Sequence, residues 1–141
     1  MFDGYTVPYE DNRFDLAVMS HVIEHVEYPR RLLNEAARVA RHVFVEVPLE
    51  HNARLPEDFA FTRTGHLNFY SRKSVRRLVQ SCGYEVVAQV VRNPSGRVYR
   101  HNYGWKGVMK HLVKDLMLQV MPGVAMGLWT YHSALLYRRP E

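Results

Sequence analysis

Residues 14–48 carry the pattern that most limits how this chain can fold. An apolar run at 14–19 begins the pattern, and a second apolar run at 43–47 ends it. The composition of the first run is typical of a strand buried on both faces. Between the runs, a helical pattern starts at Pro29, where a first turn tolerates the missing N–H. Strand, helix and strand together predict two parallel strands joined by a right-handed crossover. The apolar positions of the helix are Leu32, Leu33, Ala36, Ala37 and Ala40.

Polar side chains gather where the first predicted strand ends. Ser20, His21, Glu24 and His25 occupy the turn that follows it. Open α/β sheets bind ligands outside the carboxyl ends of their strands, so we expect this turn to form one wall of a binding site. A polar turn that only caps the next helix is the alternative interpretation.

The rest of the chain predicts a long loop followed by further helices and strands. Residues 49–70 lack periodicity, and loops of this length usually act as lids or binding loops. Ser71 as N-cap and Gly83 as a left-handed stop delimit the next helix. Residues 84–91 and 130–139 predict strands, so alternating helices and strands continue to the end.

Residues 105–120 predict an amphipathic helix with one apolar and one basic face. Lys106, Lys110 and Lys114 recur every four residues, which favours a solvated basic face, with contact to an anionic surface as the alternative. Residues 97–104 leave their secondary structure open. The apolar face consists of Val108, Met109, Leu112, Leu116 and Val120.

The bulk properties of the chain restrict its class and its location. With 141 residues, 47% of them apolar, the chain can form one domain with a core. Its formal charge of +5 predicts a general attraction to anions and no specific nucleic-acid recognition. Its one cysteine, Cys82, excludes an internal disulfide and indicates a reducing compartment, so we expect a cytoplasmic protein. Residues 116–137 carry no charge, but Pro122 interrupts them, which predicts no membrane span. The amino terminus shows no signal-peptide pattern.

Two stretches of the chain carry recognisable motifs. The first is VPYEDNRFDLAVMSHVIEHVEYPRRLLNEAARVARHVFVEVP, and the second is GHLNFYSRKSVRRLVQSCGYEVV. Together they cover most of residues 3–91 and resemble class I S-adenosylmethionine-dependent methyltransferases of the type 11 and ubiquinone-biosynthesis-like kind. The resemblance implies an α/β, Rossmann-like sheet of seven strands whose final strand is antiparallel, and it implies S-adenosylmethionine as the cofactor.

The resemblance also implies roles for individual residues. Ser20 and His21 would face the methionine part of the cofactor and the substrate. Asp3 and Gly4 loosely match the acid-containing turn that lies beside the adenine in the family, although an ordinary Asp-Gly turn explains them equally well.

Three histidines are candidate catalytic bases, because imidazole titrates near neutral pH and can accept a proton. They are His21, His25 and His66. His25 matches a recurring histidine of the family, and its alternative role is to orient the turn through a hydrogen bond. His66 lies in the long loop, where substrate contacts are expected and where surface histidines are also common.

The family's glycine-rich turn and the acidic residue that follows it are missing from this sequence. We therefore expect residues 1–141 to form a single partial domain, in which the sheet is incomplete at its amino-terminal side. Its parts would be a cofactor-side half at 1–48, a substrate-side loop at 49–70, and carboxyl-terminal helices and strands at 71–141. An incomplete sheet exposes the strand at 14–19, which predicts a homodimer or another partner pairing at that edge.

The expected function is methyl transfer to a small organic acceptor by the parent enzyme of which this chain is a portion. The cofactor carries the reactive group, and alignment of the acceptor supplies most of the acceleration. A non-catalytic methyltransferase-like subunit that binds a partner is the main alternative. A remote alternative is a zinc hydrolase, because His21 to His25 match the H-x-x-E-H pattern, which requires a helix there. We expect no metal ligands.

Overall fold

The computed structural model describes residues 5–58 and 65–140, so Asp3 and Gly4 lie outside the described residues. The elements alternate along the chain as the sequence predicts. In order they are β1 (Phe14–Ser20), α1 (Pro29–Val39), β2 (Ala40–Pro48), α2 (Arg72–Ser81), β3 (Glu85–Arg92), α3 (Gly96–Val120), α4 (Pro122–Leu128) and β4 (His132–Arg138).

The described strands form one mixed sheet in the order β1-β2-β4-β3. β1 and β2 are parallel, which confirms the predicted crossover through α1. β4 is antiparallel to both of its neighbours and lies between β2 and β3, although it comes last in the chain. The predicted antiparallel final strand is therefore confirmed, and four of the seven strands implied by the resemblance are present among the described residues.

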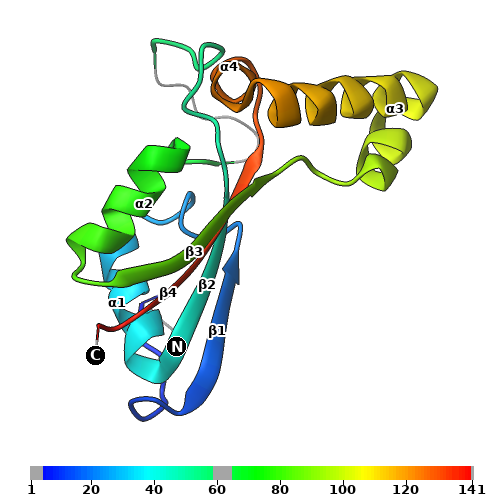
Figure 1. The fold of residues 1–141 in the computed structure, drawn as a ribbon. Helices are drawn as coiled ribbons and strands as arrows, with labels where there is room; N and C mark the ends of the chain where they lie inside the picture. Colours follow the sequence, from blue (N-terminus) through cyan, green and yellow to red (C-terminus); the bar gives the residue numbers. More distant parts are fainter. Residues whose placement is uncertain (1–4, 59–64, 141) are drawn as a thin grey trace.

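Helices α1 and α2 cover one face of this sheet (Figure 1). α1 begins at Pro29 and buries Leu33 against the strands, whereas the predicted helical residue Ala40 instead begins β2. α2 begins after Ser71, whose side chain accepts a hydrogen bond from the backbone N–H of Ser74 in a capping box. Gly83 follows α2 at a φ of 86°, as its predicted role as a stop requires. The helix side of the sheet contains the apolar core.

β1 is more exposed than its composition predicts. The side chains of Leu16 and Val18 are 50% and 62% exposed. The prediction of a strand buried on both faces is wrong, because β1 is an edge strand and only its other face, which includes the buried Met19, meets the core. The predicted open edge is therefore present in the described structure, and it is apolar.

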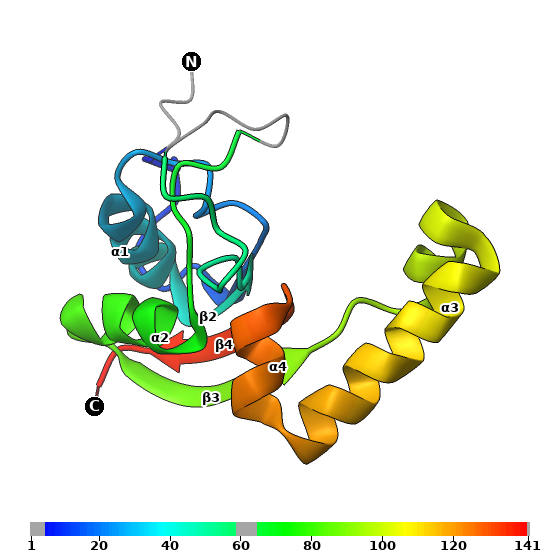
Figure 2. The same ribbon diagram turned by 90° about the horizontal axis from the view of Figure 1, so that it is seen from above.

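α3 bends back on itself and projects away from the sheet (Figures 1 and 2). Residues 97–104, which the sequence left open, are helical, and the helix breaks at Gly104, where φ is 59° and ψ is −144°. The two segments on either side of the break pack closely, and a Cβ atom on Gly107 would clash with the carbonyl oxygen of Tyr99. The bend therefore depends on glycine at both positions.

α3 exposes part of its predicted apolar face and buries one lysine of its predicted basic face. Leu112 and Leu116 are 54% and 62% exposed, whereas Lys114 is only 5% exposed. The prediction of a solvated basic face is thus wrong at Lys114, although Lys106 and Lys110 are exposed. Because α3 leaves the sheet, its apolar face meets little of the core. No helix in the described ranges has the length and apolar character needed to cross a membrane.

Candidate functional site

Three strands bring polar side chains to the carboxyl edge of the sheet. β1 and β2 end there, and the antiparallel β4 begins there. The strand register pairs Ser20 with Glu46, and the backbone N–H of His21 donates to the carbonyl of Glu46 at 3.0 Å. His132, the first residue of β4, completes a group that we call the edge cluster: Ser20, His21, Glu46 and His132.

Both carboxylate oxygens of Glu46 have partners in the edge cluster. Ser20 Oγ donates to Glu46 Oε2 at 3.0 Å, and His132 Nδ1 lies 3.5 Å from Glu46 Oε1. The imidazole rings of His21 and His132 meet edge to face with centroids 4.7 Å apart. Burial, and then the charge of His21, lower the pKa of His132 against the opposing effect of Glu46. His132 is therefore neutral near neutral pH and can accept a proton.

His21 has an unusual backbone and a fixed side chain. Its φ is 55°, a left-handed conformation that is uncommon for a residue other than glycine. Its Nδ1 donates to Glu24 Oε1 at 3.1 Å, which leaves Nε2 as the unprotonated nitrogen of the neutral ring. A carboxylate that orients an imidazole in this way is a recurring arrangement for a general base.

A second group of acids and histidines lies beside the first, and we call it the loop cluster: Glu24, His25, Glu50 and His66. His66 Nδ1 donates to Glu50 Oε2 at 2.6 Å, and His25 Nδ1 donates to the carbonyl of Gly65 at 3.3 Å. The two imidazole rings lie 4.7 Å apart. Glu24 belongs to this cluster and also bonds His21, so it connects the two clusters.

Backbone hydrogen bonds hold the long loop against the turn after β1. The N–H groups of Leu67 and Asn68 donate to the carbonyl of Glu24 at 2.7 and 3.0 Å. The side-chain amide of Asn68 donates to the carbonyl of Val26 at 2.7 Å. Tyr70 lies nearby and is buried, and burial followed by the charge of Glu24 raises its pKa. The described part of the predicted loop is therefore anchored where it meets the turn.

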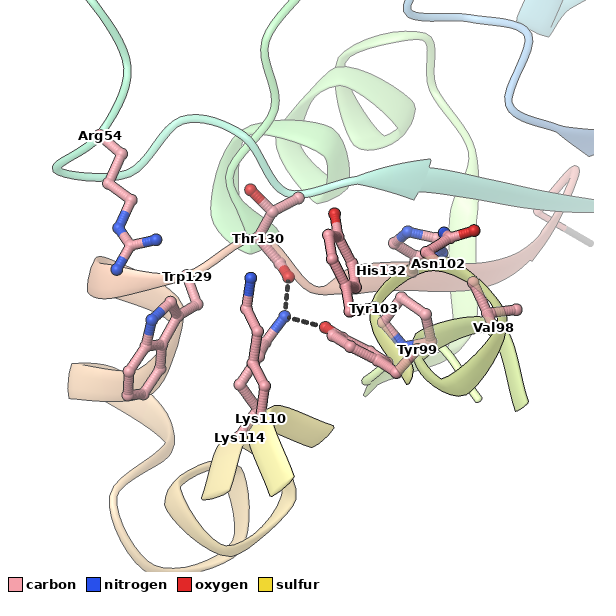
Figure 3. Close-up of a pocket in the computed structure, with 11 residues that line it drawn as sticks. Arg54, Val98, Tyr99, Asn102, Tyr103, Lys110, Lys114, Trp129, Thr130 and His132 are labelled. Carbon is pink, nitrogen blue, oxygen red and sulfur yellow. Dashed lines mark hydrogen bonds between the residues drawn. The ribbon is translucent and has the colours of Figure 1, made fainter. Parts of the chain in front are cut away.

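A cavity of about 280 Å³ opens between α3, β4 and the loop (Figure 3). His132 lines it, so the cavity borders the edge cluster. Inside it, Lys114 Nζ donates to Tyr99 Oη at 2.6 Å and to the carbonyl of Thr130 at 2.7 Å. Burial, and then the charges of Lys110 and Arg54, lower the pKa of Lys114 to about 8. The other aromatic and cationic lining residues are Arg54, Tyr103, Lys110 and Trp129.

The structure places Ser20 and His21 in the edge cluster and His25 and His66 in the loop cluster, whereas Asp3 and Gly4 lie outside the described residues. Two alternatives from the sequence analysis do not fit the turn after β1. Residues 21–28 form no helix, so the helix that the zinc-hydrolase pattern requires is absent. The N-cap of α1 is Tyr28, whose side chain makes no capping hydrogen bond, so the four polar residues of the turn do not provide the N-cap of α1. Sequence reasoning missed His132 and Glu46. Both could have been found from the predicted topology, because an antiparallel final strand begins at the edge where the parallel strands end.

Comparisons with known proteins identify the fold. A family described as "Methyltransferase domain" matches residues 2–89, which is more than half of the chain. No curated protein sequence matches the chain. Among solved structures, the [4+2]-cyclase SpnF has a TM-score of 0.61 at 18% identity, over 99% of this chain and 55% of that chain. The present chain thus spans about half the length of that relative.

Two further structures give similar values. Phosphoethanolamine N-methyltransferase 2 of Haemonchus contortus, in complex with S-adenosyl-L-methionine, has a TM-score of 0.58 at 13% identity, over 99% of this chain and 36% of that one. A candidate methyltransferase of Haloferax volcanii, in complex with the activator Trm112, has a TM-score of 0.57 at 13% identity, over 99% and 60%. At these identities, structural likeness shows the fold alone. The family match and the shared fold together show that this chain belongs to the methyltransferase domain family and has the class I S-adenosylmethionine-dependent methyltransferase fold.

Proposed function

We propose that this chain is part of an enzyme that transfers a methyl group from S-adenosylmethionine to a small organic acceptor. The observation that carries the proposal is the edge cluster, which lies at the ligand-binding edge of a sheet of this family. The neighbouring cavity of about 280 Å³ supports a small acceptor, because its size is near the lower end of the range for small-molecule sites.

The described residues fit one side of a cofactor site. Ser20 and His21 have exposed side chains at the carboxyl end of β1, and we propose that they contact the methionine part. No Gly-x-Gly sequence occurs among the described residues, so the glycine-rich part of such a site would have to come from elsewhere. S-adenosylmethionine supplies the reactive methyl group, and the protein's part is to align the acceptor with it.

We assign the role of base to His21 where the acceptor carries a proton. Its Nδ1 is held by Glu24, and its exposed ring offers Nε2 to a ligand. His25 and His66 remain candidates for the same role, but the burial of His66 and its bond to Glu50 favour His21. A solitary thiol, Cys82, supports our proposal of a cytoplasmic location.

A non-catalytic subunit is the second candidate function, and the exposed apolar edge of β1 favours it. Unpaired edge strands readily pair with another chain, either a second copy or a different partner. The Haloferax volcanii relative, which is bound to an activator, is an example of this fold in an assembly.

Isothermal titration of the folded chain with S-adenosylmethionine distinguishes these functions. One binding event per chain would support cofactor binding by the chain alone, and the absence of heat from a folded sample would contradict independent catalysis by this chain. If the chain binds, replacement of His21 by Gln should lower the production of S-adenosylhomocysteine by roughly 10²- to 10⁴-fold. The matched control is His101→Gln, an exposed histidine on α3.

A further inference from the structure

The carboxylate of Glu24 in the loop cluster is only half satisfied. The side chain is 0% exposed, and its Oε2 atom has no hydrogen-bond partner among the described residues. Its other oxygen, Oε1, accepts from His21. A buried carboxylate oxygen without a partner is costly, because it has lost its water and gained nothing in exchange. A hydrogen-bond donor or a cation bound to Glu24 Oε2 would remove this cost.

Two imidazole rings beside Glu24 are oriented so that each can offer a lone pair. His25 and His66 both use Nδ1 as a donor, to the carbonyl of Gly65 and to Glu50 respectively. In a neutral ring with the proton on Nδ1, the Nε2 atom is unprotonated and is the usual metal ligand. Potential ligand atoms of Glu24, His25 and His66 all lie within 4.8 Å of one another.

We propose that Glu24, His25 and His66 bind a divalent transition-metal ion of the Zn²⁺ type. Two imidazoles and one carboxylate are a ligand set that suits Zn²⁺, whereas Mg²⁺ and Ca²⁺ prefer oxygen ligands alone. With bonds of about 2.0–2.2 Å, ligand atoms around Zn²⁺ lie on the order of 3–4 Å apart, so small side-chain rotations close the site. His25 is exposed and leaves a route for the ion and for a water ligand.

Residues that hydrogen-bond to the proposed ligands also support a Zn²⁺ site. Glu50 holds His66 and His21 holds Glu24, which matches the way hydrogen bonds from a second layer of residues orient metal ligands. The backbone bonds from Leu67 and Asn68 to Glu24 already fix the loop beside the turn. The ion would therefore fasten residues 65–68 to the turn after β1.

The edge cluster provides an internal contrast. It also contains two histidines and a glutamate within 4.8 Å, namely His21, His132 and Glu46. Both oxygens of Glu46 already have partners within the protein, so nothing there calls for a cation. The proposal is specific to the loop cluster, and it does not depend on methyltransferase activity.

Titration of the folded chain with ZnCl₂, after removal of bound metal with EDTA and dialysis, tests this proposal. We expect one Zn²⁺ per chain and a melting temperature that rises with Zn²⁺ concentration. Replacement of His25 by Gln, and separately of His66 by Gln, should weaken binding by more than about 100-fold, and Glu50→Gln by about 10- to 100-fold. Circular dichroism checks that each variant is folded.

Two control variants keep the proposal open to contradiction. His101→Gln, at an exposed and distant histidine, should bind Zn²⁺ as the unmodified chain does. His132→Gln should also retain binding, because His132 belongs to the edge cluster. The proposal is overturned if the folded chain binds no Zn²⁺, if the His25 and His66 variants bind it unchanged, or if only the His132 variant loses it.

Discussion

The helices α1 and α3 both carry apolar and charged residues, but they bury residues of different kinds. α1 lies against the sheet, buries Leu33 and exposes Arg30 and Arg31. α3 projects from the sheet, exposes Leu112 and Leu116, and buries Lys114. The difference shows that hydrophobic periodicity predicts where a helix forms, whereas the surface that the helix meets decides which of its faces is buried.

The largest expected difference in the free energy of unfolding comes from a Leu-to-Ala substitution made once in α1 and once in α3. Leu33→Ala on α1 removes a fully buried side chain and should lower the free energy of unfolding by about 2–5 kcal/mol. Leu112→Ala on α3 should change it by less than about 0.5 kcal/mol, because this side chain is already half exposed. Urea denaturation measures both values. Equal losses would show that α3 is packed in solution against a surface that the described residues lack.

The buried lysine predicts a pH dependence that is specific to α3. Lys114 has a pKa of about 8 in the folded chain and about 10.5 when unfolded, so between these values the unfolded state binds more protons. The free energy of unfolding, relative to a Lys114→Met variant, should therefore rise by roughly 2 kcal/mol between pH 8 and pH 10.5.

The Lys114→Met variant serves as the reference because tyrosines also titrate in this range. Burial raises the pKa of Tyr137, for example, which has the opposite effect on stability above pH 10. Taking the difference between the two proteins at each pH cancels such contributions. A difference that stays constant, or that falls as the pH rises, would show that Lys114 is solvated.

Loss of the N-cap serine should lower the free energy of unfolding more at α2 than at α3, by an amount smaller than the two effects above. Ser71 at the start of α2 forms a capping box, so Ser71→Ala should lower the free energy of unfolding by about 1 kcal/mol. Ser95 occupies the same position at the start of α3 without a side-chain cap bond, so Ser95→Ala should have almost no effect. Thermal denaturation of the pair is the measurement. A larger cost at Ser95 would contradict the described start of α3.

The smallest effect on stability is expected from polar substitutions on the exposed face of α3. The double change of Leu112 and Leu116 to Gln should leave the free energy of unfolding within about 0.5 kcal/mol of its original value. It should lower the binding of a hydrophobic dye, because the exposed apolar area is reduced. Unchanged dye binding would indicate that the dye reports the apolar face of β1 instead.

Local patterns were sufficient to predict most of the elements, and long-range packing accounts for the errors. The cap at Ser71 and the stop at Gly83 are local features, and they correctly delimit α2. Whether the strand at 14–19 is covered depends on elements that pack on it from elsewhere, and its composition does not reveal them. The burial of Lys114 likewise depends on Tyr99 and Thr130, which are distant in sequence or across a bend.

The candidate site was predictable to the extent that it follows one strand. Ser20 ends β1, and His21 and His25 lie in the turn that follows it. Their grouping with His66 needed only the expectation that a long loop lies near a ligand site. The contribution of His132 required the order of strands in the sheet. The half-satisfied carboxylate of Glu24 required atomic positions, because it depends on which oxygen His21 contacts.

The central place of β4 has a consequence for how the chain acquires its structure during synthesis. β1 and β2 can pair as soon as both have left the ribosome, but β3 pairs in the described sheet only with β4, which is made some 40 residues later. At about 5–20 residues per second, β3 waits for seconds with both edges open. A chain that ended before residue 132 would therefore have β1 paired with β2 but would leave β3 without a partner strand in the described sheet.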